Sequence, residues 1–257
     1  MDNLNKTELK DFLEYTVEKY NRPAFIDLDP ISIPHKFSIK EDIEISSFLT
    51  ATISWGNRKA ILKAANQMIL YMGDSPYDFV ISASESQLNR TSDFYYRTFN
   101  GTDFNYFIHS LRNIYKKHGG LENVFNELST RYSLQETIGR FKEVFFELPH
   151  QERTEKHVSD PTNNSAAKRI NMMLRWLVRN DNAGVDFGIW KHISTSSLSC
   201  PLDVHSGNTA RKLGILNRKQ NDAKAVFELD SILREFDPID PVKYDFALFG
   251  LGVIERF

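Results

Sequence analysis

The chain has 257 residues, of which 41% are apolar and 26% are charged, and its formal net charge is -2. This length suits one large domain or two small ones, and the charge excludes binding of polyanions through bulk positive charge. The single cysteine, Cys200, excludes a disulfide framework and a cysteine metal cluster. The sequence has no apolar run suited to a membrane span and a charged, amphipathic N-terminus, which predicts a cytoplasmic protein.

Helical periodicity dominates the first part of the sequence. A helix over 6–20 is predicted by one apolar stripe, formed by Leu9, Phe12, Leu13 and Val17. Ser38 and Glu41 have the spacing of a capping box, which predicts the start of a second helix. Gly56 and Asn57 interrupt the helical pattern, and a third helix closes at Gly73. Residues 38–73 therefore predict a helical hairpin.

The helical pattern continues beyond the hairpin. Asp103 is the predicted cap of a helix that ends at Gly119–Gly120, and further helical segments are expected up to 128 and over 134–147. The polar stretch 149–165 is predicted to be a loop because it contains Asp160-Pro161 and few apolar residues. It separates two expected lobes, about 38–150 and 165–257, of a single unit covering 1–257.

Three predicted helices complete the C-terminal lobe. They span about Ala166 to Arg179, 222–235 and 241–251, and Asp240-Pro241 provides the last helix with a suitable N-cap and first residue. A further helix is expected after Asp203. Because no strand pattern is convincing, the predicted fold class is all-α.

The helix at 166–179 has an apolar face and a cationic face. Lys168, Arg175 and Arg179 fall within a narrow arc, and no acidic residue lies between Ser165 and Asn180. One interpretation is a solvated polar face. The other is a functional one: Lys168 lies in the first turn, where the helix dipole and neighbouring arginines are expected to lower the lysine pKa. A deprotonated lysine is a nucleophile.

Asp203 precedes the predicted helix VHSGNTARKLG, with Ser206 three residues further on. Aspartate is among the best N-cap residues, so capping alone explains this position. A carboxylate held by backbone N–H groups also stays ionised, and it can stabilise positive charge or transfer a proton. Both interpretations remain open.

The segments KRINMMLRWLVR, GVDFGIW, PLDVHSGNTARKLG and DPVKYDFALFGLG resemble an uncharacterised bacterial all-helical family. The order of helical hairpin, lysine-bearing helix and aspartate-led helix more remotely resembles the helix-hairpin-helix DNA glycosylase superfamily. The branch most similar is the archaeal-type 8-oxoguanine glycosylases. This resemblance implies two helical subdomains with a cleft between them. The usual L-P-G-V-G hairpin is absent, and the cysteines of the iron–sulfur branch are missing, so no cluster and no cofactor are expected.

The resemblance implies base excision from damaged duplex DNA. The substrate would be a flipped purine such as 8-oxoguanine. Lys168 would attack the sugar C1′, displace the base and form a Schiff base, and elimination would then nick the strand. Asp203 would stabilise the cationic sugar.

Further residues are candidates for contacts with DNA. The predicted phosphate contacts are Arg175, Arg179, Arg211 and Lys212. His205 would contact either a phosphate or the sugar near Asp203. Asn57 and Arg58 either enter a groove or cap a helix. The candidates for stacking on a base are Trp55, Tyr244 and Phe246, although core packing is favoured for Trp55 and Phe246. Asp245 is first a turn or cap residue, although it could face a site. The histidines show no metal-binding spacing, so no metal is expected.

Two other functions remain open: a non-catalytic nucleic-acid-binding protein and a helical protein-interaction module. A pocket that contains both Lys168 and Asp203 would favour the enzyme. A basic groove with the two side chains far apart would favour the binding protein, and an acidic or flat surface would favour the interaction module. The sequence does not specify the lesion or the oligomeric state.

Overall fold

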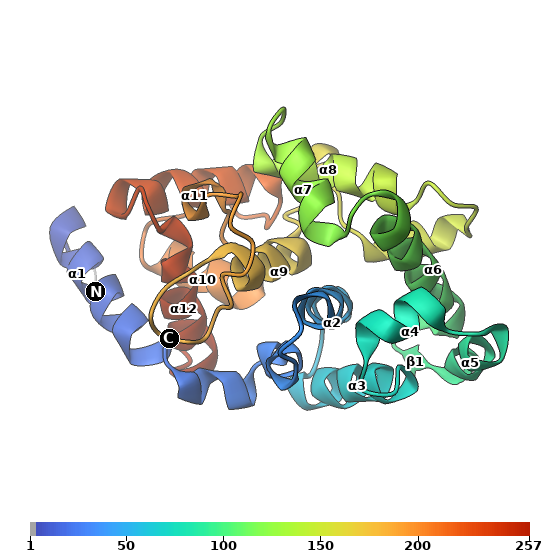
Figure 1. Cartoon of the computed structure of the whole chain (residues 1–257). Coiled ribbons are helices and arrows are strands. Elements are labelled where there is room, and N and C mark those ends of the chain that lie inside the picture. The colour runs from blue at the N-terminus through green and yellow to red at the C-terminus, as the bar shows by residue number, and fades with distance from the viewer. Residues whose placement is uncertain (1–3) are drawn as a thin grey trace. The chain divides into compact units, whose positions relative to one another are not determined.

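The structure is a computed structural model that describes residues 4–257, and the chain forms two compact units. Unit 1 combines the N-terminal segment up to Asp27 with Asp160–Phe257, and unit 2 is Leu28–Ser159. Figure 1 colours the chain from blue to red along its length. The predicted lobes 38–150 and 165–257 fall within unit 2 and unit 1, respectively. The sequence did not predict that the N-terminal helix belongs with the C-terminal half.

Unit 1 consists mainly of helices around an aliphatic core. Its helices are α1 (Lys6–Tyr20), α9 (Lys168–Val178), α10 (Val204–Lys212), α11 (Ala223–Phe236) and α12 (Tyr244–Phe249), followed by a π-helical turn, Gly250–Ile254. Helix α1 packs against α12, and α10 packs against both α12 and the π-helical turn. The apolar stripe predicted for 6–20 is buried at Leu9, Leu13 and Val17. The core also includes Leu202, Ala210, Leu229, Leu233 and Leu248.

Unit 2 is helical with an aromatic core. Its helices are α2 (Lys40–Thr52), α3 (Arg58–Tyr71), α4 (Pro76–Ser82), α5 (Glu85–Arg90), α6 (Gly101–Lys117), α7 (Leu121–Ser129) and α8 (Leu134–Phe145). The Phe48 ring lies 5.1 Å from Phe145 and 5.6 Å from Phe107 between ring centroids. All three side chains are fully buried. Such aromatic pairs add stability beyond their buried area.

The described residues confirm a mostly helical, all-α class. One small exception is a hairpin of β1 (Tyr95–Tyr96) and β2 (Phe99–Asn100), which pair antiparallel. Strands of two residues are too short to produce a detectable alternation of apolar and polar residues. Within residues 4–257, no helix combines the length and apolarity required to cross a bilayer.

Helix starts were predicted with mixed success. Helix α2 begins at Lys40 after Ile39, which provides no side-chain cap, so the prediction of Ser38 as N-cap is wrong. Asn100 is the N-cap of α6, and Asp103 is its capping-box partner instead of the cap itself. Both errors concern the exact first residue of a helix, which sequence patterns resolve poorly.

Candidate active site

Asp203 is the N-cap of α10, as predicted, and its carboxylate is held by two backbone N–H groups. Its Oδ1 accepts hydrogen bonds from the backbone N–H groups of His205 at 2.9 Å and Ser206 at 3.0 Å. The Ser206 hydroxyl oxygen accepts from the Asp203 N–H at 2.9 Å. This capping box fixes the direction of the carboxylate, and such a cap typically contributes about 1 kcal/mol to stability.

The loop after α10 also holds the backbone of Asp203. Asn221 Nδ2 donates to the Asp203 carbonyl oxygen at 2.8 Å, and Arg211 Nη2 donates to Asn221 Oδ1 at 2.6 Å. A Cβ at Gly207 would lie 2.7 Å from Asn221 Oδ1, so a larger residue here would displace the Asn221 side chain. Arg211 Nε donates to the Arg218 carbonyl oxygen at 2.8 Å. The structure therefore gives Arg211 a positioning role.

Lys168 is the first residue of α9 and follows a strained residue. Ala167 has φ 44° and ψ 36°, a left-handed conformation that costs a non-glycine residue about 1–2 kcal/mol. The Ala167 N–H donates to Ser165 Oγ at 3.1 Å, and Asn171 Nδ2 donates to the Ala166 carbonyl oxygen at 3.1 Å. These hydrogen bonds hold the sharp turn from which Lys168 emerges.

The two candidate catalytic residues, Lys168 and Asp203, meet in space. Lys168 Nζ lies 3.8 Å from Asp203 Oδ2, and each side chain is 27% exposed. The carboxylate is thus divided: Oδ1 caps α10, whereas Oδ2 faces the amine. A loose, partly exposed pair of this kind contributes little to stability. It leaves both groups accessible to a ligand.

Arg175 and Arg179, predicted to contact phosphate, are buried instead. Arg175 pairs with Asp186 at 3.3 Å and with Asp245, and Arg179 pairs with Asp186 at 3.0 Å and Asp240 at 2.8 Å. The arginines are 3% and 2% exposed. The structure therefore corrects the predicted phosphate contacts of both residues. Their acidic partners come from later segments of the chain, which the charge pattern of the helix alone did not show.

Two of the predicted base-stacking residues are also in the interior. Phe246 is fully buried, with the Arg175 guanidinium 4.3 Å from its ring centroid. Tyr244 is fully buried, and its hydroxyl donates to Glu14 at 2.6 Å. Stacking on a base requires an accessible ring face. The structure therefore corrects the stacking prediction for Tyr244, and at Phe246 it has the core packing that the sequence analysis favoured.

The remaining predicted residues of the N-terminal half belong to unit 2. Trp55 is half-buried, and its ring centroid lies 5.5 Å from Tyr96. Asn57 caps α3 by accepting from the Ala60 N–H at 3.3 Å, which is the capping alternative of the sequence analysis. Arg58 is the first residue of α3. The predicted DNA contacts of Asn57 and Arg58 and the predicted stacking of Trp55 stay predictions.

Asp245 is a buried acid within electrostatic reach of the pair. Burial raises the pKa of its carboxyl, with opposition from Arg175, and the Asp203 carboxylate raises this pKa further, to about 6. Cys200 Sγ donates to Asp245 Oδ1 at 3.8 Å, and burial raises the pKa of the Cys200 thiol well above its usual range. A carboxyl that titrates near neutral pH beside a Lys–Asp pair is typical of functional sites.

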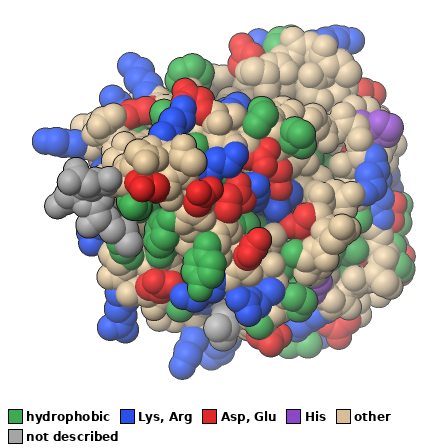
Figure 2. All heavy atoms as spheres, turned by 90° about the vertical axis from the view of Figure 1, so that its left-hand side faces the viewer, with side chains coloured by type: hydrophobic (Ala, Val, Ile, Leu, Met, Phe, Trp, Pro, Cys, Tyr) green, Lys and Arg blue, Asp and Glu red, His purple; other side chains and the backbone are tan. Residues whose placement is uncertain are grey.

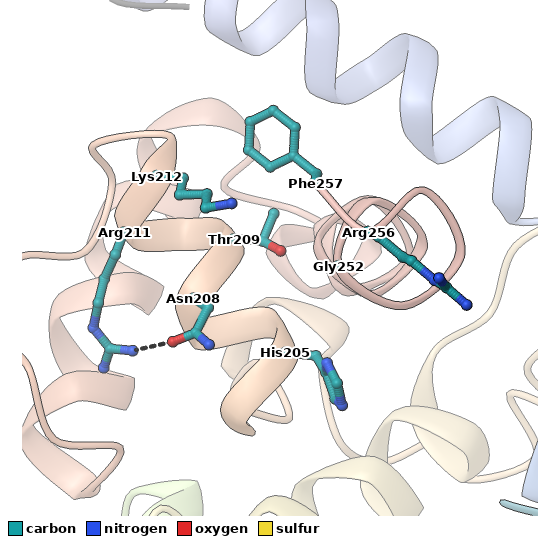
Figure 3. Close-up of a pocket in the computed structure, with 8 residues that line it drawn as sticks. All are labelled: His205, Asn208, Thr209, Arg211, Lys212, Gly252, Arg256 and Phe257. Atoms are coloured by element: carbon teal, nitrogen blue, oxygen red, sulfur yellow. Dashed lines mark hydrogen bonds between the residues drawn. The ribbon is translucent and has the colours of Figure 1, made fainter.

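His205 and Lys212, both predicted to contact DNA, are exposed and lie on one face of α10. They line a pocket of about 470 Å³ together with residues that the sequence analysis missed (Figure 3). The missed residues are Asn208, Thr209, Gly252, Arg256 and Phe257. The glycine in the C-terminal helical segment was the available signal, because a helical glycine often marks close packing.

The described residues thus form an all-α protein with a lysine–aspartate pair between the starts of two helices. The chain belongs to the family "Protein of unknown function (DUF2400)", whose family model matches residues 29–254. This range includes Lys168 and Asp203. Comparisons with curated proteins and with solved structures found no match. Among residues 4–257, no group of three or more His, Cys, Asp or Glu residues is placed to hold a metal ion.

Proposed function

We propose that this protein is a DNA base-excision glycosylase with abasic-site lyase activity, acting on a damaged purine of the 8-oxoguanine type. The proposal rests on one observation: Lys168 Nζ lies 3.8 Å from Asp203 Oδ2, with both groups partly exposed. The resemblance of the helix order to helix-hairpin-helix glycosylases supports the choice of reaction. A two-lobed glycosylase-like fold is part of the same proposal.

The chemistry uses the lysine as nucleophile. The unprotonated Lys168 amine attacks the sugar C1′ as the bond from C1′ to the base nitrogen breaks, and the base leaves with the bonding electrons and takes up a proton. Loss of a proton from the new amine and opening of the sugar ring give a Schiff base. A base then removes a proton from C2′, a double bond forms between C2′ and C3′, and the phosphate leaves C3′ with the electron pair of the C3′–O bond, which nicks the strand. Hydrolysis of the Schiff base releases the amine.

Asp203 stabilises the positive charge that develops on the sugar. Its Oδ1 is fixed by the backbone N–H groups of His205 and Ser206, so Oδ2 can face the reacting centre without reorganising. Preorganised charges of this kind typically contribute a factor of about 10²–10³ to the rate. The same carboxylate can accept the proton that the amine loses.

The test measures base release and strand nicking with duplex oligonucleotides that carry 8-oxoguanine or an abasic site. We expect Lys168→Gln to abolish nicking of both duplexes. Asp203→Asn should slow base release by about 10²–10³-fold. Asparagine is as good an N-cap as aspartate, so this variant removes the charge while keeping the cap.

A matched control is Lys224→Gln, which removes an exposed lysine of α11 in unit 1. It should leave both rates unchanged. Salt-sensitive DNA binding without base release or nicking would overturn the enzyme and favour a binding protein. If the protein neither acts on nor binds the duplex, Asp203 is only a helix cap, and an interaction module is favoured.

A further inference from the structure

The charged side chains on the surface do not by themselves show where an anion would bind to unit 1. Figure 2 shows a face of the molecule on which Lys and Arg side chains are interspersed with Asp and Glu side chains. On that face the cations do not form a continuous surface of one sign. An anion-binding site therefore has to be identified from a pocket and the groups that line it.

The pocket lies along one face of α10. His205, Thr209 and Lys212 follow one another at helical spacing, and Gly252, Arg256 and Phe257 line the pocket from the C-terminal segment. Figure 3 shows Lys212 and Phe257 at one end and His205 at the other. The Lys212 amine lies 5.5 Å from the centroid of the Phe257 ring. The volume of the pocket, about 470 Å³, is in the range of small-ligand sites.

Basic side chains dominate this lining, and none of the eight described lining residues is acidic. His205, Lys212 and Arg256 are all exposed. The neighbouring acid, Glu255, is bound elsewhere, because it accepts hydrogen bonds from Lys19 and Tyr20 at 2.6 Å each. Without a carboxylate in the lining, this set of donors favours an anion.

Thr209 provides a second, independent indication of a ligand. Its side chain is 1% exposed, and within residues 4–257 its hydroxyl has no hydrogen-bond partner. A threonine in a helix usually donates to a carbonyl one turn earlier, and a buried hydroxyl without a partner is costly. In Figure 3 the hydroxyl points toward the segment that carries Gly252. A Cβ at Gly252 would lie 2.7 Å from this oxygen.

We propose that this pocket binds one phosphate group of the nucleic-acid strand whose sugar lies at Lys168 and Asp203. Lys212 and Arg256 provide the charge, the His205 ring lines the same pocket, and the Thr209 hydroxyl donates to a phosphate oxygen. Asp203 caps the same helix, so the rise of about 1.5 Å per residue places Thr209 roughly 9 Å along the axis from it. The choice of a strand as ligand rests on the proposed function; the anion site itself does not.

The first experiment compares charge variants by their salt dependence. The dissociation constant for an undamaged duplex is measured between 50 and 200 mM salt for Lys212→Ala, Arg256→Ala and the double variant. The matched control is Arg22→Ala with Lys224→Ala, which removes two exposed cations of unit 1. If both residues hold one phosphate, the double variant lowers the slope of log K against log salt by about 1. A fall of about 2 would assign them to separate phosphates and overturn the single site.

The second experiment uses Thr209→Val, which keeps the shape and removes the hydroxyl. We expect this variant to bind the duplex several-fold more weakly while the free protein is at least as resistant to urea as the wild type. A residue with a purely structural role would not separate these two readouts. Unchanged duplex affinity in Thr209→Val, or a double variant that matches the control, would overturn the proposal.

Two further measurements distinguish free phosphate from a nucleic-acid phosphate as the ligand, and failure of the phosphate site from failure of the proposed glycosylase. Inorganic phosphate is compared with chloride at equal ionic strength in a thermal-shift assay. Stabilisation by inorganic phosphate without duplex binding would overturn the strand as ligand. Wild-type protein that binds the duplex through the pocket but releases no base would leave the phosphate site standing and overturn the glycosylase.

Discussion

One buried carboxylate of unit 2, Asp103, and two of unit 1, Asp230 and Asp245, have pKa shifts of opposite sign. In unit 2, burial raises the pKa of Asp103, but the His157 ring beside it and a hydrogen bond from the Asn100 N–H outweigh this effect and hold the pKa at about 2. In unit 1, burial dominates at Asp230 and Asp245, whose pKa values rise to about 6.

This difference separates a structural acid from acids near a proposed site. Asp103 is fully compensated, because it also accepts from Arg153 and Thr154 at 2.8 Å each. Asp245 is undercompensated and lies within electrostatic reach of Lys168 and Asp203. The raised carboxyl pKa of Asp245 and the strained backbone of Ala167 both occur close to the Lys168–Asp203 pair, as is common at functional sites.

The largest effect is expected from Asp186→Asn. This change removes a charge that both Arg175 and Arg179 require in the interior of unit 1. Breaking such a buried network costs about 3–5 kcal/mol of unfolding free energy. This cost is measured by urea unfolding followed by tryptophan fluorescence in a Trp55→Phe background. In that background the remaining tryptophans, Trp176 and Trp190, both belong to unit 1 and report on its unfolding. The surface variant Glu235→Gln should cost less than about 1 kcal/mol, and an equal effect of the two would contradict the network.

The second prediction concerns pH and Asp230. Its folded pKa of about 6 lies above the value of 3.8 for a free aspartate, so between these values the folded state binds more protons than the unfolded state. Its contribution to stability therefore rises as pH falls from 7 to 4, by about 2 kcal/mol. Asp230→Asn should remove this component in urea titrations at pH 7 and pH 4.5. An unchanged pH dependence would count against the contrast between the units.

The third prediction has the opposite sign, in unit 2. The pKa of Asp103 is lowered from 3.8 to about 2, so its ionised form contributes about 2 kcal/mol that is present above pH 4 and lost as pH falls through 2. Asp103→Asn should therefore accelerate hydrogen exchange of α6 at pH 7. If hydrogen exchange of α6 in Asp103→Asn matches that of the wild type at pH 7, the partners of the Asp103 carboxylate do not stabilise its charge as stated.

The smallest effect is expected at Asp203 itself. Asp203→Asn should change unfolding free energy by less than about 0.5 kcal/mol, whereas Asp203→Ala should cost about 1 kcal/mol because the cap is lost. Urea unfolding of the two variants provides the comparison. A large cost of Asp203→Asn would show that its charge serves stability, and it would weaken the assignment of this charge to chemistry.

Local features of the fold were predictable, and tertiary ones were not. The extent of α1 and the capping box of Asp203 and Ser206 followed from the sequence because both depend on residues within one turn. The burial of Arg175 and Arg179 did not, because their partners arrive from distant segments. No sequence signal marks the left-handed Ala167, since glycine or asparagine usually occupies such a position.

The candidate site was predictable in its central pair but not in its surroundings. Lys168 was singled out by its place in a basic first turn, and Asp203 by its place at a helix start. Their approach to 3.8 Å required the folded chain. The pocket residues Arg256 and Phe257 follow a helical segment without any motif, so only the packing of that segment against α10 brings them to the site.

The most direct test of the account is borohydride trapping on a duplex with an abasic site, followed by peptide mapping of the adduct. We expect a covalent adduct at Lys168 that is lost in Lys168→Gln and retained in Lys224→Gln. An adduct on another lysine, or no adduct from wild-type protein that binds the duplex, would contradict the role of the Lys168–Asp203 pair.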